Sequence, residues 1–242
     1  KIREAAKFGT GRDANVRPAS ESRRDQCFQG PKIGQPANLD ASDMLVVMPT
    51  ILVLVLAITA AAQGWQPVSG WQETKFTGHG TTRVENGVIF LDPGSPMSGV
   101  TRSAAFPKTN YEIRFEATRI KGGDFFASLT FPAGESHCTW VTGGWGGDIV
   151  GLSSIDGWDA SDNETRTYFT FETARWYAFR IQVTASHIKA WIDEKQIINA
   201  PIAGREISLR RGEMNLSTPL GFASYNTAGS IRNVEYRPLP RP

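Results

Sequence analysis

The sequence predicts an all-β fold, a two-sheet sandwich of the jelly-roll type. From residue 65 onward, short segments of alternating polar and apolar residues follow one another, separated by polar turns rich in Gly, Asn and Asp. No part of that region shows the 3.6-residue apolar period of a long amphipathic helix. About a dozen short strands joined by polar turns are typical of two packed antiparallel sheets.

The first strong strand signals lie between residues 82 and 120. Residues 82–92 contain Asn86 and Gly87 between β-branched and apolar residues, which predicts a hairpin with a two-residue turn. Residues 111–120 alternate apolar and polar side chains, as a strand with one buried side must. Ile113 and Phe115 are therefore expected in the core.

The second half of the domain repeats this alternation. Four segments show it, 176–183, 187–192, 221–225 and 230–236. Asp193 and Glu194 predict a turn after the second of them. Trp176 and Trp191 belong to regularly alternating strands, and we expect both in the core.

Residues 125–166 concentrate tryptophans, glycines and short acidic residues, and we predict that they form the functional site. Residues 125–131 and 137–142 are expected to form a hairpin. Four glycines surround Trp145, so the backbone there can adopt positive φ while one large aromatic side chain stays exposed. A strand over 148–152 is followed by a polar loop over 153–164. Loops of that length in a compact domain are usually functional or mobile.

Three parts of the chain are expected. Residues 1–43 lack any apolar period, which indicates a disordered leader or sequence translated upstream of the true start. Residues 44–62 contain an uncharged apolar run that ends in three alanines, which resembles a secretory signal peptide, with a membrane anchor as the alternative. Residues 63–242 form the β-sandwich domain. We therefore expect an exported protein, secreted or held in the periplasm or cell envelope.

Charge and cysteine usage exclude several function classes. The formal net charge is +2, and residues 44–242 contain equal numbers of acidic and basic side chains. Such a balance does not recruit nucleic acid, nor a membrane surface beyond a possible N-terminal anchor.

Cys27 lies in the leader and Cys138 alternates within a predicted strand, so we expect Cys138 to be a small buried side chain.

The predicted site suits carbohydrate. Indole rings offer flat apolar faces to a pyranose, and carboxylate, amide and guanidinium groups hydrogen-bond its hydroxyls. The expected substrate-binding residues are Trp140, Trp145, Asp156, Trp158, Asp159, Asn163 and Glu164. We expect no cofactor. Ca²⁺ is a minor alternative, because residues 156–164 supply hard oxygen ligands at spacings unlike those of an EF-hand.

Many short motifs, in order and spacing, resemble the 3-keto-disaccharide hydrolase domain, a family of the concanavalin A-like lectin/glucanase superfamily. The resemblance covers residues 64–238. Its motifs are Gly64-Trp65, Val84-Glu85-Asn86-Gly87-Val88, Pro93-Gly94, Tyr111-Glu112-Ile113-Arg114 with Glu116, Gly144-Trp145-Gly146-Gly147, Gly151-Leu152-Ser153-Ser154, Trp176-Tyr177 and Trp191-Ile192-Asp193.

The resemblance implies a bacterial, exported protein that acts on oxidised sugars. Many members carry an Asn-Ser-Gly block and a Tyr-Glu-x-Gln strand ending in Asp, and this chain differs there, at residues 126–130 and 137–141. Cleavage of a 3-keto-glycoside needs a base for the C2 proton and a donor for the enolate oxygen. His137 is the expected base, Arg166 or a glycine-loop amide the donor, and Asp148 a third catalytic residue. A non-catalytic carbohydrate-binding module is the alternative.

Overall fold

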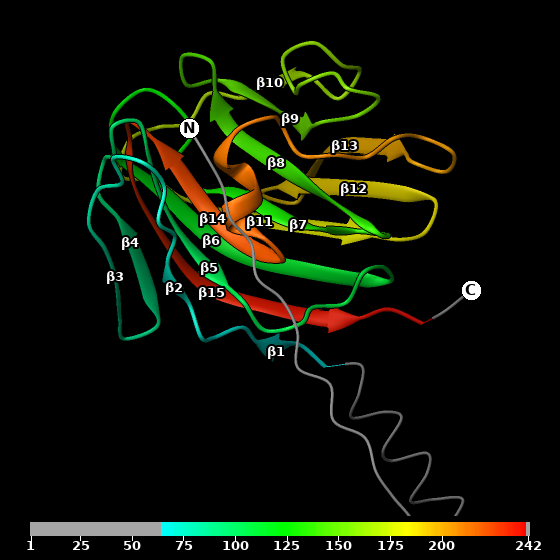
Figure 1. Cartoon of the computed structure of the whole chain (residues 1–242), viewed down its shortest axis with the longest axis horizontal. Helices are drawn as coiled ribbons and strands as arrows, with labels where there is room; N and C mark the ends of the chain where they lie inside the picture. Colours follow the sequence, from blue (N-terminus) through cyan, green and yellow to red (C-terminus); the bar gives the residue numbers. More distant parts are fainter. Residues whose placement is uncertain (1–63, 241–242) are drawn as a thin grey trace, which may run out of the picture. The chain divides into compact units, whose positions relative to one another are not determined.

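The computed structural model describes residues 64–240 (Figure 1). The leader over 1–43 and the signal or anchor segment over 44–62 lie outside the described residues. The predicted fold class is confirmed, because the described part is an all-β sandwich of two antiparallel sheets. Apart from strands, it contains one short 3₁₀ helix, η1 (Glu213–Ser217).

Sheet A contains eight strands. Seven pair in the order β13, β12, β11, β6, β15, β4 and β3, and β1 pairs with the far end of β15. Their bounds are β1 (Gln66–Pro67), β3 (Thr82–Glu85), β4 (Val88–Leu91), β6 (Tyr111–Lys121), β11 (Trp176–Val183), β12 (His187–Ile192), β13 (Lys195–Pro201) and β15 (Ala228–Pro238).

Sheet B contains seven strands in the order β10, β9, β8, β7, β14, β5 and β2. Their bounds are β2 (Gln72–Glu73), β5 (Met97–Arg102), β7 (Ser128–Ala133), β8 (Ser136–Gly144), β9 (Ile149–Ser153), β10 (Thr167–Tyr168) and β14 (Leu220–Tyr225). The chain passes repeatedly between the two sheets, so residues that are distant in sequence meet on each face.

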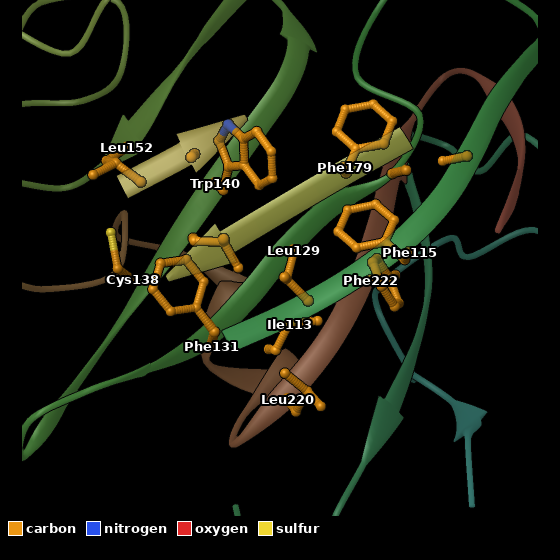
Figure 2. Close-up of a cluster of buried hydrophobic side chains, with 14 of the residues drawn as sticks. Ile113, Phe115, Leu129, Phe131, Cys138, Trp140, Leu152, Phe179, Leu220 and Phe222 are labelled. Carbon is orange, nitrogen blue, oxygen red and sulfur yellow. The ribbon is translucent and has the colours of Figure 1, made fainter. Parts of the chain in front are cut away.

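Aromatic side chains fill the space between the sheets (Figure 2). Phe115 of β6 stacks on Phe179 of β11, with ring centroids 4.9 Å apart and an interplanar angle of 5°. Trp140 of β8 and Phe222 of β14 approach these two rings edge-on from sheet B. The predicted burial of Ile113 and Phe115 is confirmed. These contacts between the sheets form the centre of the core.

Several local predictions are also confirmed. Glu85 pairs with Val88 across the predicted two-residue turn. The hairpin of the site region forms as β7 and β8, although β7 begins at Ser128 and extends through the proline at its end. Cys138 is buried, and burial raises the pKa of its thiol to about 12. The thiol is thus held in the protonated, unreactive form.

The expected burial of Trp176 and Trp191 in the core is wrong. A strand directs successive side chains to opposite faces, and Tyr177 and its alternate neighbours occupy the inner side of β11. Both indoles are therefore half-buried on the outer face of sheet A. There, the guanidinium of Arg232 lies 4.0 Å from the ring centroid of Trp176, and that of Arg180 lies 3.6 Å from Trp191.

Among residues 64–240, no helix has the length and apolarity needed to cross a membrane.

Phe115→Ala is expected to lower the free energy of unfolding by about 3 to 5 kcal/mol, because it leaves a cavity among stacked rings. Ile120→Ala on the same strand is the control, since that side chain is 48% exposed. It is expected to change stability by only about 0.5 kcal/mol. Urea unfolding of the two variants checks this, and equal losses would contradict the described core.

Candidate functional site

A pocket of about 430 Å³ lies on the outer face of sheet B. Its floor includes Ser128, Thr139 and Ser153, from the adjacent strands β7, β8 and β9. The hydroxyls face outward because the neighbouring residues Leu129 and Trp140 occupy the core side of the same strands. The floor of the pocket is therefore a row of small polar side chains.

Two of these hydroxyls are oriented by the backbone, and the third, on Thr139, shares a hydrogen bond with the hydroxyl of Thr130 at 3.0 Å. The Oγ of Ser128 accepts a hydrogen bond from the amide of Thr142 at 3.2 Å, and that of Ser153 accepts one from Ala160 at 2.8 Å. A hydroxyl that accepts in this way keeps its own hydrogen for donation to another group. The floor thus presents hydrogen-bond donors to whatever enters the pocket.

The segment that contains η1 forms one wall. Met214 packs against Phe76 and Ala223, which anchors this segment to the outer face of sheet B. Upstream, the backbones of Ser154 and Ser208 exchange two hydrogen bonds, at 2.6 and 3.1 Å. Arg210 and Arg211 line the pocket between these two anchors, together with Gly212 and Glu213.

Trp145 forms the opposite wall, and its predicted exposure is confirmed at 38%. The residue lies in the turn between β8 and β9 with a positive φ of 48°. The guanidinium of Arg210 lies 5.4 Å from its ring centroid and is also paired with Asp159 at 3.1 Å. A cation–π contact thus connects the two walls of the pocket.

A buried arginine holds the turn that carries Trp145. Arg119 of β6 is only 7% exposed, and its Nη2 donates to the carbonyl of Gly147 at 2.5 Å. Its guanidinium also lies 5.3 Å from the ring centroid of Phe126 and 5.7 Å from that of Phe171. Burial lowers the pKa of Arg119, and the charges of nearby acidic groups oppose that change. The guanidinium stays charged, as arginine does in proteins.

This contact explains two of the four glycines around Trp145, Gly143 and Gly147. A Cβ on Gly143 would lie 2.6 Å from the Nη2 of Arg119, and one on Gly147 would lie 3.3 Å from Nη1. Both residues also have positive φ, which glycine adopts without strain. The glycines let the turn close onto the guanidinium, and Trp145 is left at the surface.

Asp124 is the carboxylate beside the Trp145 turn. It lines the pocket, and its Oδ1 accepts a hydrogen bond from the amide of Phe125 at 2.8 Å. Its Oδ2 lies 3.5 Å from the amide nitrogen of Gly146. The other lining carboxylate, Glu213, is bound by the amide and hydroxyl of Thr77, which hold its pKa below the usual value. Both contacts of Asp124 come from backbone amides, whereas Glu213 is also bound by a side-chain hydroxyl.

The three residues expected to act in catalysis are not brought together. His137 lies at the start of β8, and Asp148 lies beyond its other end, in the turn after Gly144. The strand between them spans about 23 Å at ~3.3 Å per residue. Arg166 donates to the carbonyl of Ser161 within its own loop. None of the three lines the pocket.

His137 has the protonation state of a base but not the surroundings of one. Burial, and secondarily the charge of Lys108, lowers the pKa of its imidazole. The ring is therefore neutral at neutral pH. However, its strand partner is Pro132, at the end of the sheet away from Trp145.

The expectation that Trp140 binds a sugar is wrong. Its side chain is fully buried between the sheets, 5.5 Å from the ring of Phe179 (Figure 2). Two residues of β8 on opposite sides of the strand cannot both line one surface, and Thr139 takes the outer position.

The polar residues of the 153–164 loop mainly hold the loop itself. Asn163 donates to the carbonyls of Leu152 and Trp158 and accepts from Thr165. Asp156 and Glu164 both bind Arg205, at 2.6 and 2.8 Å, and this arginine is the main cause of their lowered pKa values.

Two acids of this loop therefore converge on one guanidinium, and a third, Asp159, pairs with Arg210. Among residues 64–240, no group of three or more His, Cys, Asp or Glu is arranged to hold a metal ion. Trp158 is 63% exposed but does not line the pocket.

Sequence reasoning missed most of the lining residues. Asp124, Arg210, Arg211 and Tyr225 come from three separate segments, and only the tertiary fold joins them. The one signal for this site in the sequence was the pair Arg210 and Arg211, which lies in a stretch without strand alternation.

Gly143→Ala is expected to destabilise the domain by at least about 1 kcal/mol more than Gly146→Ala. Both positions have positive φ, so both variants carry about 1 to 3 kcal/mol of backbone strain. Only the first adds a Cβ against Arg119, because nothing lies within 4 Å of a Cβ at Gly146. Urea unfolding measures the difference. Equal destabilisation would show that Arg119 does not determine the glycine pattern.

Comparisons with known proteins agree with the fold. No protein-family model and no curated protein matches the chain. The carbohydrate-binding module CBM66 from Bacillus subtilis is similar at a TM-score of 0.48 and 13% identity, over 70% of this chain and 96% of that one. Domain 4 of AbnA, an extracellular arabinanase from Geobacillus stearothermophilus, in complex with arabinotriose, is similar at a TM-score of 0.48 and 14% identity. The match covers 70% of this chain and 82% of that one. The Crh5 transglycosylase is similar at a TM-score of 0.45 and 10% identity, over 75% of this chain and 83% of that one.

Proposed function

We propose that this domain binds a carbohydrate in the Trp145 pocket. The observation that carries the proposal is the exposed indole, which a buried arginine holds beside a pocket whose floor includes three hydroxyl side chains. A sugar ring presents C–H groups on its faces and hydroxyls at its edge. An aromatic wall beside a floor of oriented hydroxyls complements both.

The wall opposite Trp145 adds directional donors. Arg210 and Arg211 present guanidinium N–H groups that can bind vicinal hydroxyls or a carbonyl. Arg210 is oriented by Asp159, whose carboxylate also accepts from the hydroxyl of Ser154. The predicted sugar residue Asp159 would then act indirectly, by positioning an arginine. We further propose that the protein is exported, on the signal-like segment over 44–62.

Cleavage of 3-keto-glycosides is the second candidate function, and the position of the Asp124 carboxylate in the pocket lining favours it. In that reaction a base removes the C2 proton, which the neighbouring ketone acidifies. The electrons form an enolate and then expel the C1 substituent, which leaves with its bonding pair and takes a proton. Water finally adds to the resulting double bond. Asp124 would serve as the base, and Arg210 or Arg211 would stabilise the enolate oxygen.

Trp145→Ala is expected to weaken binding of gluco-oligosaccharides, oxidised or not, by about tenfold or more, because it removes the apolar wall. Trp158→Ala is the matched control, since Trp158 is the more exposed indole but lies outside the pocket. Isothermal titration calorimetry gives both affinities. Loss of binding in Trp158→Ala alone would place the sugar on the 153–164 loop and refute the pocket.

Asp124→Asn is expected to lower the turnover of a 3-keto-glucoside by about 10² to 10⁴-fold, the usual contribution of a general base, while the affinity changes little. His137→Ala is the control and should retain turnover. Release of the aglycone from 3-keto-glucosides and from their unoxidised parents is measured by chromatography. Normal turnover in Asp124→Asn would exclude Asp124 as the base. If the wild-type protein binds the sugars but cleaves none of them, the domain is a carbohydrate-binding module and not an enzyme.

A further inference from the structure

A larger cavity of about 720 Å³ lies on the opposite side of the sandwich, over the outer face of sheet A. Strands β12, β11, β6 and β15 form its floor, and β1 forms one edge. Its most prominent side chains are two indoles, Trp65 and Trp191. Neither belongs to the Trp145 pocket. We refer to this cavity as the sheet A cleft.

One row of residues runs across the strands through the cleft. Trp191 pairs with Arg180, Arg180 with Arg114, and Arg114 with Glu235. Pro67 of β1 pairs with Glu235 and extends the row, and Trp65 lies two residues before it. At ~4.8 Å per strand the row spans about 19 Å, which is longer than one pyranose ring. The space above it opens because Ala178, beside Arg180, carries only a methyl group.

The guanidinium groups in the row are fixed in place. Arg180 lies 3.6 Å from the ring centroid of Trp191, and Arg114 lies 4.3 Å from that of Trp65. Arg180 also donates to Glu112, which is 2% exposed, and Arg114 donates to Glu235. Arginines held at both the planar face and the N–H edge offer their remaining donors in a fixed geometry.

The arginines in and around the cleft are paired with glutamates, and this decides which ligand fits. Arg180 and Arg237 pair with Glu112, Arg114 pairs with Glu235, and Arg232 pairs with Glu116. Glu194 at the edge of the cleft brings the acidic side chains to four, equal to the arginines. A surface whose positive and negative side chains are paired with one another does not attract a phosphate, a nucleic acid or a polycation.

We propose that the sheet A cleft is a second carbohydrate site, and that its ligand is a neutral oligosaccharide lying across the strands. The indoles contact the faces of the sugar rings, and the fixed arginine and glutamate edges bind the hydroxyls. The site is independent of the Trp145 pocket, so one domain would hold two glycan segments on opposite faces.

The test uses cellotetraose and maltotetraose as neutral probes, with trigalacturonic acid as a charged comparison. All are titrated into the Trp145→Ala variant, so that only the second site is measured. The indole N–H signals of Trp65 and Trp191 are followed by NMR, and affinity by calorimetry. We expect a neutral tetrasaccharide to shift both signals at millimolar concentration, and the charged trimer to shift neither.

Trp191→Ala is expected to weaken this binding by about tenfold. Trp176→Ala is the matched control, because Trp176 lies on the same face under Arg232 but outside the cleft. It should change the affinity less than about twofold. Ala178→Phe provides a second variant that removes no contact. Its new ring fills the cleft from an exposed position and should also abolish binding.

Three results would overturn the proposal. They are the absence of any shift of the Trp65 and Trp191 signals with both neutral probes, equal loss of affinity in Trp176→Ala and Trp191→Ala, and full binding by Ala178→Phe. Because this test follows Trp65 and Trp191 in a variant that lacks Trp145, failure here is distinguishable from failure of the Trp145 pocket.

Discussion

In this domain each long strand gives one side to the core, and that alternation decides where every functional group can lie. The stacked pair of Phe115 and Phe179, with Trp140 set edge-on against Phe179, uses the inner sides of β6, β11 and β8. The outer sides are then free to carry polar groups. On sheet B they supply the hydroxyls of a pocket floor, and on sheet A they supply a lattice of arginines and glutamates.

The exposed tryptophan depends on the core as directly as on the surface. Arg119 belongs to β6 of sheet A, yet it binds the turn between two strands of sheet B. Because the guanidinium is buried, displacing the turn would leave a charge without its partner, which is costly. The buried arginine therefore stabilises the one backbone shape that places Trp145 beside the pocket. The glycines are the residues that this shape tolerates.

The two proposed carbohydrate sites offer different groups to a ligand. The Trp145 pocket combines one indole with hydroxyls and two arginines from a long connection. In the sheet A cleft, Trp191, Arg180, Arg114 and Glu235 come from neighbouring strands in register, and Trp65 directly precedes β1. A site built on strands is held more rigidly than one walled by a loop.

The sequence by itself determined the fold class, the Asn86-Gly87 hairpin, the burial of Ile113 and Phe115, and the exposure of Trp145, because these follow from local period and glycine content. It did not determine which side of its strand each tryptophan would occupy. Trp140 lies inside and Trp176 outside, since register against neighbouring strands sets which side faces the core. Nor did it show that Asn163 and Asp156 would hold their own loop. The tertiary structure alone joined Asp124, Arg210 and Trp145, because residues from separate segments meet only when the two sheets pack and the connection to β14 crosses one face.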